Sequence, residues 1–223
     1  MGEQSSVFDM IGPVMIGPSS SHTAGVVKIG GVAYRLLQGK PEEVAITFYN
    51  SFARTYEGHG SDRAILAGLM GFAPDDKRIK DALNLAEKEQ LQFHFKSVGN
   101  ASTLHPNTVK VEMVKGQDKQ ALVGESRGGG VIRIREVNGF DANFTSALHT
   151  MIIEADDTKG SIAFITDILS HDGCNIATMT VSRKGKNDMA CLILEMDSAP
   201  KEISIQYIDH LDWVKKTRYI PVL

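Results

Sequence analysis

Apolar residues follow two different spacings along the chain, and the way these spacings alternate predicts its fold. Segment 22–38 carries apolar residues at the i, i+3, i+4 spacing of one helix face. Segment 44–48 instead alternates apolar and polar residues, as a half-buried strand does. The same patterns predict further helices at 64–70 and 75–90 and further strands at 93–95, 109–113, 121–126 and 131–134. Because strands, helices and hairpin turns are mixed, we expect an α+β fold, with this half forming a mixed α/β domain.

The pattern changes near residue 148, and from there it predicts a second domain. Its elements follow the order β-α-β-β-α-β, with strands at 151–153, 176–182, 189–196 and 214–220. Gly173 is placed to end the first helix as a C′ residue. We expect apolar residues of the two helices to face inward: Ile162, Ile165, Ile168, Leu169, Ile203, Tyr207, Ile208 and Leu211. The chain is therefore predicted to comprise domains 1–147 and 148–223, the second a ferredoxin-like sandwich.

The composition is that of an ordinary globular protein and excludes several classes of function. Of its 223 residues, 42% are hydrophobic and 23% are charged, and the net charge is -3. The sequence has no basic stripe interleaved with aromatic residues, which argues against nucleic acid as a partner. The apolar runs are too short to span a bilayer, and the N-terminus lacks the pattern of a signal peptide. We therefore expect a cytoplasmic protein that acts on small molecules or on other proteins.

The cysteine count limits the metal chemistry of the chain. There are two cysteines, Cys174 and Cys191, and they do not form a closely spaced pair. A four-iron cluster normally takes three or four cysteine thiolates, so the chain does not supply one alone. We expect both cysteines to be buried apolar residues and no residue of this chain to bind metal.

A serine-rich stretch at 18–25 carries the first candidate site. Serine and threonine oxygens cap the first turn of a helix, and here they precede the helix predicted at 22–38. The free amides of that turn, together with the helix dipole, also favour an anion. On residue type alone a plain cap is the more frequent explanation. Our hypothesis is that the stretch holds a carboxylate.

Two histidine-containing segments carry the other candidates. His59 lies between glycines in 58–62, where it either bonds backbone as a loop residue or transfers a proton near neutral pH. Ser61 or Asp62 is expected to cap the helix that follows; Asp62 alternatively orients His59. Segment 105–108 forms a polar loop that either places polar groups in a site or shapes a turn. The glycines at 128–130 lack the strand-to-helix setting of a phosphate loop.

The C-terminal part resembles an ACT domain, a small regulatory module that commonly binds amino acids between paired copies. The residues that carry the resemblance are Asp157-Thr158-Lys159-Gly160 and Gly173-Cys174-Asn175-Ile176. The resemblance implies that Gly160, Asn175 and Ile176 contact an effector and that the domain forms homodimers. A domain used for dimerisation alone remains an alternative.

The N-terminal part resembles the beta chain of iron-sulfur-dependent L-serine dehydratases. The stretch 6–25 matches the start of that family, and 58–62 and 105–108 match its later motifs in order. Ser61 stands where threonine is more usual, and the charges at 125–127 also depart from the pattern.

This resemblance implies conversion of L-serine to pyruvate and ammonia. An alpha chain would contribute the [4Fe-4S] cluster that binds the substrate hydroxyl as a Lewis acid. It also implies catalytic roles for His59 and His22, and substrate binding by Ser19, Ser20, Ser21, His22, Thr23, Asp62, His105 and Asn107. The chain is then one half of a lyase.

Two other functions remain open at this stage. A non-catalytic amino-acid sensor would use both halves to bind small carboxylates and would control another protein. An allosteric module of the kind found in some phosphoglycerate dehydrogenases is a further option, although no dinucleotide fingerprint is present.

Overall fold

The computed structural model describes residues 14–101, 103–186 and 188–223. The sequence stretch that precedes residue 14 in the first motif lies outside the described residues. The chain divides into two compact units, Met1–Gly139 and Phe140–Leu223. The expected domain boundary at 147/148 falls between β6 (Phe140–Phe144) and β7 (His149–Asp156). That a regulatory domain begins at residue 148 stays a prediction.

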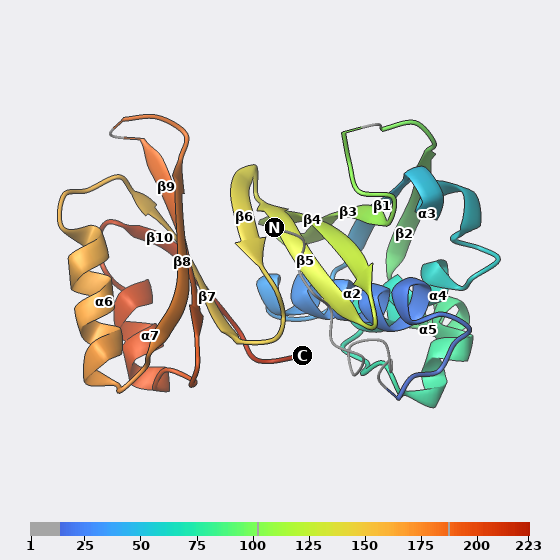
Figure 1. The fold of residues 1–223 in the computed structure, drawn as a ribbon, viewed down its shortest axis with the longest axis horizontal. Coiled ribbons are helices and arrows are strands. Elements are labelled where there is room, and N and C mark those ends of the chain that lie inside the picture. The colour runs from blue at the N-terminus through green and yellow to red at the C-terminus, as the bar shows by residue number, and fades with distance from the viewer. Residues whose placement is uncertain (1–13, 102, 187) are drawn as a thin grey trace. The chain divides into compact units, whose positions relative to one another are not determined.

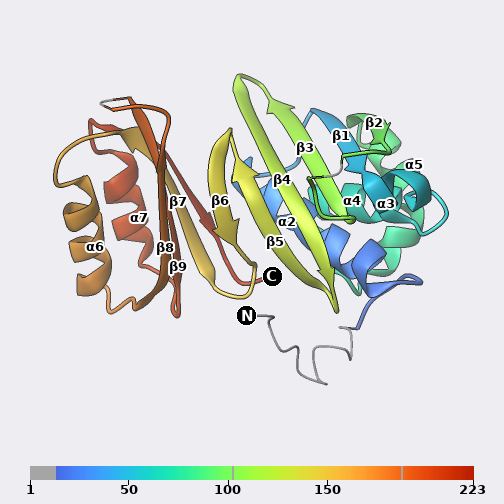
Figure 2. The same cartoon turned by 45° about the horizontal axis from the view of Figure 1, so that its top comes forward.

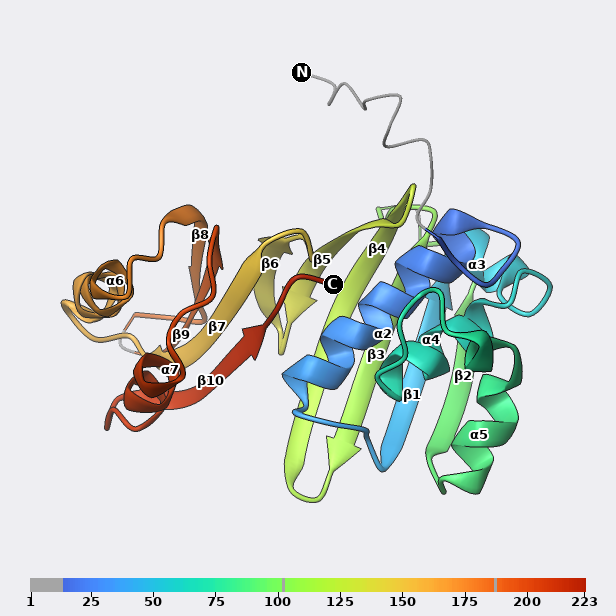
Figure 3. The ribbon, with the colours of Figure 1, turned by 90° about the horizontal axis from the view of Figure 1, so that it is seen from below.

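In the first unit, helices cover one face of a mixed sheet (Figure 3). The strand order is β2-β1-β3-β4-β5, in a sheet whose sixth strand, β6, begins the second unit. Strand β1 runs parallel to the edge strand β2 and antiparallel to β3. Figure 3 shows α2 and α4 side by side against this sheet. The elements are η1 (Ser20–Ala24), α2 (Gly25–Leu36), β1 (Glu43–Tyr49), α3 (Asn50–Thr55), α4 (Ser61–Leu69), η2 (Lys77–Asp81), α5 (Ala82–Lys88), β2 (Gln92–Val98), β3 (Thr108–Lys115), β4 (Asp118–Gly128) and β5 (Val131–Val137).

The close packing of α2 on α4 depends on two glycines. A Cβ added at Gly68 would lie 2.2 Å from the carbonyl oxygen of Val27, and one added at Gly30 would lie 2.6 Å from that of Ile65. Any larger residue would therefore force the helices apart. Since both candidate motifs lie at the N-terminal ends of these helices, this contact fixes their relative position.

The structure differs from the sequence prediction in three elements, two in the first unit and β6 at the start of the second. The helix expected at 75–90 is divided into the 3-10 helix η2 and α5, because Asp81 leaves the helical region at φ -114° and ψ 16°. The Asp81 carboxylate accepts a hydrogen bond from the Asn84 amide, a local interaction that competes with helix continuation. Helix α3 and strand β6 were not expected.

The second unit has the predicted β-α-β-β-α-β order, which confirms the ferredoxin-like fold. Its four-stranded sheet has the antiparallel order β10-β7-β9-β8, and both helices cover one face (Figures 1 and 2). Gly173, at φ +78°, follows the C-terminal residue of α6 as expected. The elements after β7 are α6 (Ser161–His171), β8 (Ile176–Arg183), β9 (Met189–Met196), α7 (Glu202–Asp209) and β10 (Val214–Ile220).

The two helices bury fewer apolar residues than their spacing suggested. Ile165, Leu169 and Ile208 are fully buried, but Ile203 is 67% exposed and Tyr207 is 53% exposed. Both helices are short and lie over a narrow sheet, so one stripe of each reaches the core. Ile162 is also exposed, at 40%, so the expectation that Ile162, Ile203 and Tyr207 face inward was wrong. Both cysteines are buried and free, as expected. None of the helices in the described ranges is long and apolar enough to cross a membrane.

Candidate functional site

The serine-rich stretch forms the turn that starts α2, and its first serine is the cap. Ser19 has extended backbone angles (φ -148°, ψ 129°), and its Oγ accepts a hydrogen bond from the backbone N–H of His22 at 3.3 Å. The carbonyl of Ser19 accepts from the N–H of Thr23 at 2.8 Å. The first turn is π-helical, Ser20–Ala24. The predicted cap is therefore confirmed.

Both ring nitrogens of His22 have partners in the chain. Nδ1 lies 3.2 Å from the hydroxyls of Ser19 and Ser21, and Nε2 lies 3.1 Å from Oγ1 of Thr55. The Thr55 hydroxyl donates its own proton to the carbonyl of Ser51 at 2.9 Å. It therefore accepts from Nε2–H of His22, and Nδ1 of the neutral ring accepts from a serine hydroxyl. These contacts fix the tautomer and orientation of His22.

Burial is the main cause that lowers the pKa of His22 below its ordinary value, and the neighbouring His59 adds to it. The neutral ring is therefore favoured near physiological pH. Because its lone pair and its N–H are both engaged, His22 is suited to hold other groups in place rather than to exchange a proton with substrate.

His59 packs against His22 from the loop between α3 and α4. The ring centroids are 4.5 Å apart and the rings are almost perpendicular, at 89°. The backbone N–H of His59 donates to the carbonyl of Thr55 at 2.9 Å, and Gly60 adopts the left-handed conformation at φ +73°. The glycine turn thus presents the exposed imidazole of His59 beside the half-buried ring of His22.

The two residues expected to cap α4 have other contacts. The N-cap is Gly60, which has no side chain, so the prediction of a Ser61 or Asp62 cap was wrong. Ser61 is buried and donates to the carbonyl of His22 at 3.0 Å. Asp62 accepts from the N–H of Arg63 at 2.7 Å, and its burial raises its pKa above the ordinary value. Among the described contacts, Asp62 has no hydrogen bond or ion pair with His59.

A pocket of ≈ 320 Å³ opens beside the histidine pair. It brings together the serine-rich segment, the N-terminal end of α4 and helix η2. Among the sequence-predicted site residues, Thr23 and His59 line it, and Arg63 and Lys80 add two cationic side chains. Within the part of the chain that the structure describes, the Thr23 hydroxyl has no hydrogen-bond partner; it lies against Gly17, where an added Cβ would approach within 2.2 Å. The lining residues are Ile16, Gly17, Pro18, Thr23, His59, Gly60, Arg63, Ile79 and Lys80.

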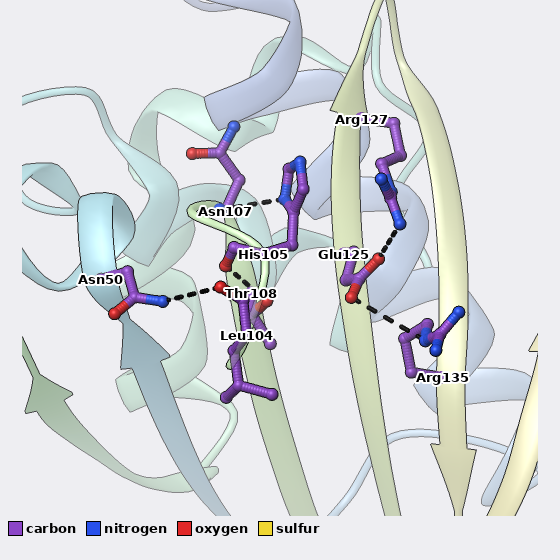
Figure 4. A network of polar contacts seen from close by, with 8 residues as sticks. All are labelled: Asn50, Leu104, His105, Asn107, Thr108, Glu125, Arg127 and Arg135. Carbon is purple, nitrogen blue, oxygen red and sulfur yellow. Dashed lines mark hydrogen bonds and ion pairs between the residues drawn. The ribbon is translucent and has the colours of Figure 1, made fainter. Parts of the chain in front are cut away.

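The His105 loop is held by hydrogen bonds within itself and to α3 (Figure 4). Nδ1 of His105 accepts from the N–H of Asn107 at 3.1 Å, and Thr108 donates its hydroxyl proton to the His105 carbonyl at 2.7 Å. Burial and then the Arg127 charge lower the pKa of His105, against the opposing effect of Glu125. His105 and Asn107 do not line the pocket beside His59.

Helix α3 joins this loop to His22. At its first residue, the Asn50 side-chain amide donates to the carbonyls of Ala101 and Leu104 at 2.9 and 3.1 Å (Figure 4). The next backbone N–H, that of Ser51, donates to the carbonyl of Pro106 at 3.0 Å. At the other end, Thr55 accepts from His22. One short helix therefore contacts the His105 loop at one end and the histidine pair at the other.

The charges at 125–127 form a compact group beside that loop. Glu125 is 6% exposed, and its carboxylate pairs with Arg127 at 2.5 Å and with Arg135 at 3.9 Å (Figure 4). Ser126 donates its N–H to the carbonyl of Asn107 at 3.0 Å. These residues support the loop from β4.

The predicted effector residues of the second unit are not brought together within one chain. In the strand register, Asp156 at the end of β7 pairs with Met189, whereas Ile176 at the start of β8 pairs with Met196, at the other end of β9. Gly160 follows β7 and so lies at the opposite end of the sheet from Ile176. Asn175 donates to the Asp197 carboxylate at 2.6 Å.

Sequence reasoning missed Thr55, Arg63, Lys80 and Asn50. Arg63 directly follows the His59 motif, so its position was a usable signal. Thr55 and Asn50 belong to α3, whose sequence has no helix periodicity, and Lys80 joins the pocket through tertiary packing alone. No local pattern marks these three.

Comparison with known proteins places the chain in a family. Residues 6–137, more than half of the chain, match the family model described as serine dehydratase beta chain. The chain is 43% identical over 192 residues to the probable L-serine dehydratase, beta chain, of Bacillus subtilis (strain 168), covering 86% of this chain and 87% of the relative. It is 32% identical over 218 residues to the L-serine dehydratase, beta chain, of Peptoniphilus asaccharolyticus, covering 97% and 98%.

A more distant likeness, 25% over 195 residues, is to D-3-phosphoglycerate dehydrogenase of Bacillus subtilis (strain 168), covering 82% of this chain and 37% of that protein. The family match, by contrast, includes all three motifs around the histidine pair and the His105 loop. The chain belongs to the serine dehydratase beta chain family.

Proposed function

We propose that this chain is the beta subunit of a two-chain L-serine ammonia-lyase and that its first unit holds the substrate carboxylate. Membership of the family supports a serine dehydratase subunit. The observation that carries the proposal is the pocket that Thr23 and His59 line together beside the fixed ring of His22. Thr23 lines the pocket, and we propose that its hydroxyl and that of Ser20 in the same turn contact the substrate, whereas Ser19 and Ser21 act through His22.

His59 is the proposed proton-transfer residue. Deamination of L-serine removes the α-proton and the β-hydroxyl to give aminoacrylate, which becomes an imine and hydrolyses to pyruvate and ammonia. His59 is exposed on the pocket, whereas His22 has both nitrogens engaged. The His59 imidazole is therefore the group of this chain best placed to take the α-proton. His105 and Asn107 belong to a supporting loop in this scheme, and Asp62 acts through Arg63.

The residues of this chain do not fit an iron-sulfur cluster. Within the described ranges, no group of three or more His, Cys, Asp and Glu residues is arranged to hold a metal ion. Both cysteines are buried in the second unit, and burial together with Glu154 raises the pKa of Cys191 to about 12. Two cysteines cannot supply the three or four thiolates that a four-iron cluster normally takes. We therefore propose that an alpha chain holds the [4Fe-4S] cluster and the hydroxyl end of serine.

Reconstitution tests this proposal. The chain is purified anaerobically alone and together with a cluster-bearing alpha chain, and pyruvate formation from L-serine is measured. Activity is expected in the complex and not in either chain alone. Turnover by the isolated, iron-free chain, or an inactive complex that carries an intact cluster, would overturn it.

We further propose that the second unit binds an amino acid between two copies of the chain. The support is the resemblance to ACT domains and the strand register, which separates Gly160 from Asn175 and Ile176 within one copy. A second copy is needed to bring both ends to one ligand. Calorimetry of L-serine against the full chain, with the oligomeric state measured in parallel, is expected to show binding by the dimer; binding by a monomer contradicts this arrangement.

A non-catalytic sensor is the second candidate, favoured by the likeness to a phosphoglycerate dehydrogenase segment. In that case a His59→Ala change would alter ligand binding while turnover in the reconstituted complex stays the same. A loss of kcat with binding retained distinguishes the lyase subunit from the sensor.

A further inference from the structure

The pocket beside His59 has more positive charge than its serine motif requires. Arg63 and Lys80 both line it, one from the first turn of α4 and the other from η2. Both residues are exposed, and among the described contacts neither forms an ion pair, although the charge of Arg63 acts on the adjacent Asp62 and lowers its pKa against the larger effect of burial. By contrast Arg78, on the same 3-10 helix as Lys80, pairs with Asp76 at 2.6 Å.

The other polar groups of the pocket also suit an anion. Helix α4 begins directly after Gly60, so the positive end of its dipole lies beside the pocket. Two of its first amides already have partners: Ser61 N–H donates to the Tyr56 carbonyl at 2.8 Å and Arg63 N–H to the Asp62 carboxylate at 2.7 Å. Thr23 is 2% exposed, and its hydroxyl has no hydrogen-bond partner in the described structure. A buried hydroxyl without a partner is costly, and a bound group can satisfy it. Ile16, Pro18 and Ile79 add apolar side chains to the lining of the pocket.

The serines, by contrast, are already engaged. Ser19 and Ser21 lie at 3.2 Å from Nδ1 of His22 and at 3.2 Å from each other. Neither serine lines the pocket. Their hydroxyls are therefore needed to hold His22 and are not free to surround a carboxylate.

We infer that Arg63 and Lys80 form the cationic half of a small-carboxylate site in this pocket, with Thr23 as its buried hydroxyl. This inference rests on the proposed function only in naming the ligand as the carboxylate of the lyase substrate. An arginine can bind both oxygens of a carboxylate in parallel, whereas a lysine contributes a point charge. The volume of ≈ 320 Å³ is at the small end of the range for ligand pockets, as a three-carbon hydroxy amino acid needs.

Steady-state kinetics of the reconstituted complex tests the assignment. Arg63→Gln and Lys80→Gln are each expected to raise KM for L-serine about tenfold or more, with kcat changed by less than about threefold, because a charge-assisted hydrogen bond is lost in substrate binding. Arg63→Lys keeps the charge but loses the paired hydrogen-bond geometry, so its KM is expected to lie between that of the wild type and that of Arg63→Gln. Matched controls are Lys77→Gln, on the same 3-10 helix, and Arg35→Gln on α2; both residues are exposed and outside the pocket.

Two substrate analogues, one with a carboxylate and one without, distinguish a loss of carboxylate binding from a general disturbance of the pocket. The inhibition constant of 3-hydroxypropanoate, which has the carboxylate but no amine, is expected to rise about tenfold in both variants. That of L-serinamide, which lacks the carboxylate, is expected to stay within about twofold. Equal weakening of both ligands, or an unchanged KM for L-serine, would overturn the assignment.

Binding to the full chain without its partner keeps this test apart from the proposed function. In NMR titration with 3-hydroxypropanoate, saturable shifts are expected for the amides of Gly60, Thr23 and Arg63 in the wild-type chain and a weaker affinity in Arg63→Gln. Absence of these shifts, or equal affinity in the variant, contradicts the carboxylate site. An inactive complex with intact carboxylate binding would contradict the lyase proposal alone.

Discussion

The two units carry candidate sites of opposite construction. In the first unit, residues distant in the sequence meet within one chain: His22 contacts Thr55 at 3.1 Å and His59 ring to ring at 4.5 Å. In the second unit, Gly160 and Ile176 lie close in sequence but at opposite ends of the sheet. The first site is assembled by folding, and the proposed second site needs another copy of the chain. Motif spacing alone does not reveal which of the two applies.

The difference arises from how each unit places its helix ends. In the first unit, the glycine contact between α2 and α4 brings two helix N-termini to the same region, and both motifs lie there. In the second unit, the single helix α6 separates Gly160 at its start from Asn175 after its end. A helix of this length carries its two ends well apart, about 1.5 Å for each residue.

The largest expected effect is the fall in kcat when His59 is replaced, and it tests whether the first site contains the proton-transfer group. His59→Ala removes the proposed proton-transfer group, and kcat of the reconstituted complex is expected to fall about 10²–10⁴-fold. His94→Ala is the matched control, because His94 is exposed on β2 and outside the pocket. The fold should be unchanged by circular dichroism. A kcat within about threefold of the wild type would remove His59 from the chemistry.

Gly68→Ala is expected to have the next largest effect, on stability. The added Cβ would meet the carbonyl of Val27 at 2.2 Å, and overpacking of this kind costs about 1–3 kcal/mol. Trp213, the single tryptophan, reports unfolding of the second unit by fluorescence, while circular dichroism reports both units. The urea midpoint of the first unit should fall and that of Trp213 should not. The control Gly99→Ala adds a methyl group where nothing lies within 4 Å. Equal loss at both probes would mean that the units unfold together.

Local physics made much of the fold predictable from sequence. The alternation in β1 and β3 and the C′ glycine at 173 follow from backbone geometry over a few residues, and the structure agrees with them. The Ser19 cap is equally local. Exposure of Ile203 and Tyr207 was not predictable in this way, because helix periodicity shows which face is apolar but not how much of it a narrow sheet covers.

The site was predictable where it lies on motifs and not where tertiary packing completes it. His22 and His59 stood out by their neighbours in sequence. Thr55 fixes the His22 tautomer from 33 residues away, and Lys80 enters the pocket from a helix that local side-chain bonding had divided. Neither leaves a local signal, since each acts through a contact between distant segments.

A smaller effect is expected at Thr55, which tests whether the fixed orientation of His22 matters. Thr55→Val keeps the shape but cannot accept from Nε2–H of His22, so a buried donor loses its partner. We expect kcat to fall about tenfold with KM nearly unchanged, and the pH profile to move. Thr55→Ser keeps the hydroxyl and is the rescue variant. If valine and serine behave alike, the hydroxyl contact has no positioning role.

The smallest expected effect is the pH dependence of stability that His22 contributes, because its pKa differs between the folded and the unfolded chain. Burial and then His59 hold the folded pKa below the ordinary 6.5, so between these two values the unfolded chain binds more protons than the folded one. Stability from the neutral ring is therefore fully present above about pH 6.5 and is lost as pH falls toward the lower folded value.

Urea midpoints measured by circular dichroism at pH 7.5 and 5.5 should differ more in the wild type than in His22→Gln. The loss should be smaller than that from Gly68→Ala, because His22 is half-buried. His105 has its pKa lowered in the same direction and leaves a residual slope in the variant. An equal slope in both proteins would show that the ring of His22 is as free to take a proton as it is in the unfolded chain.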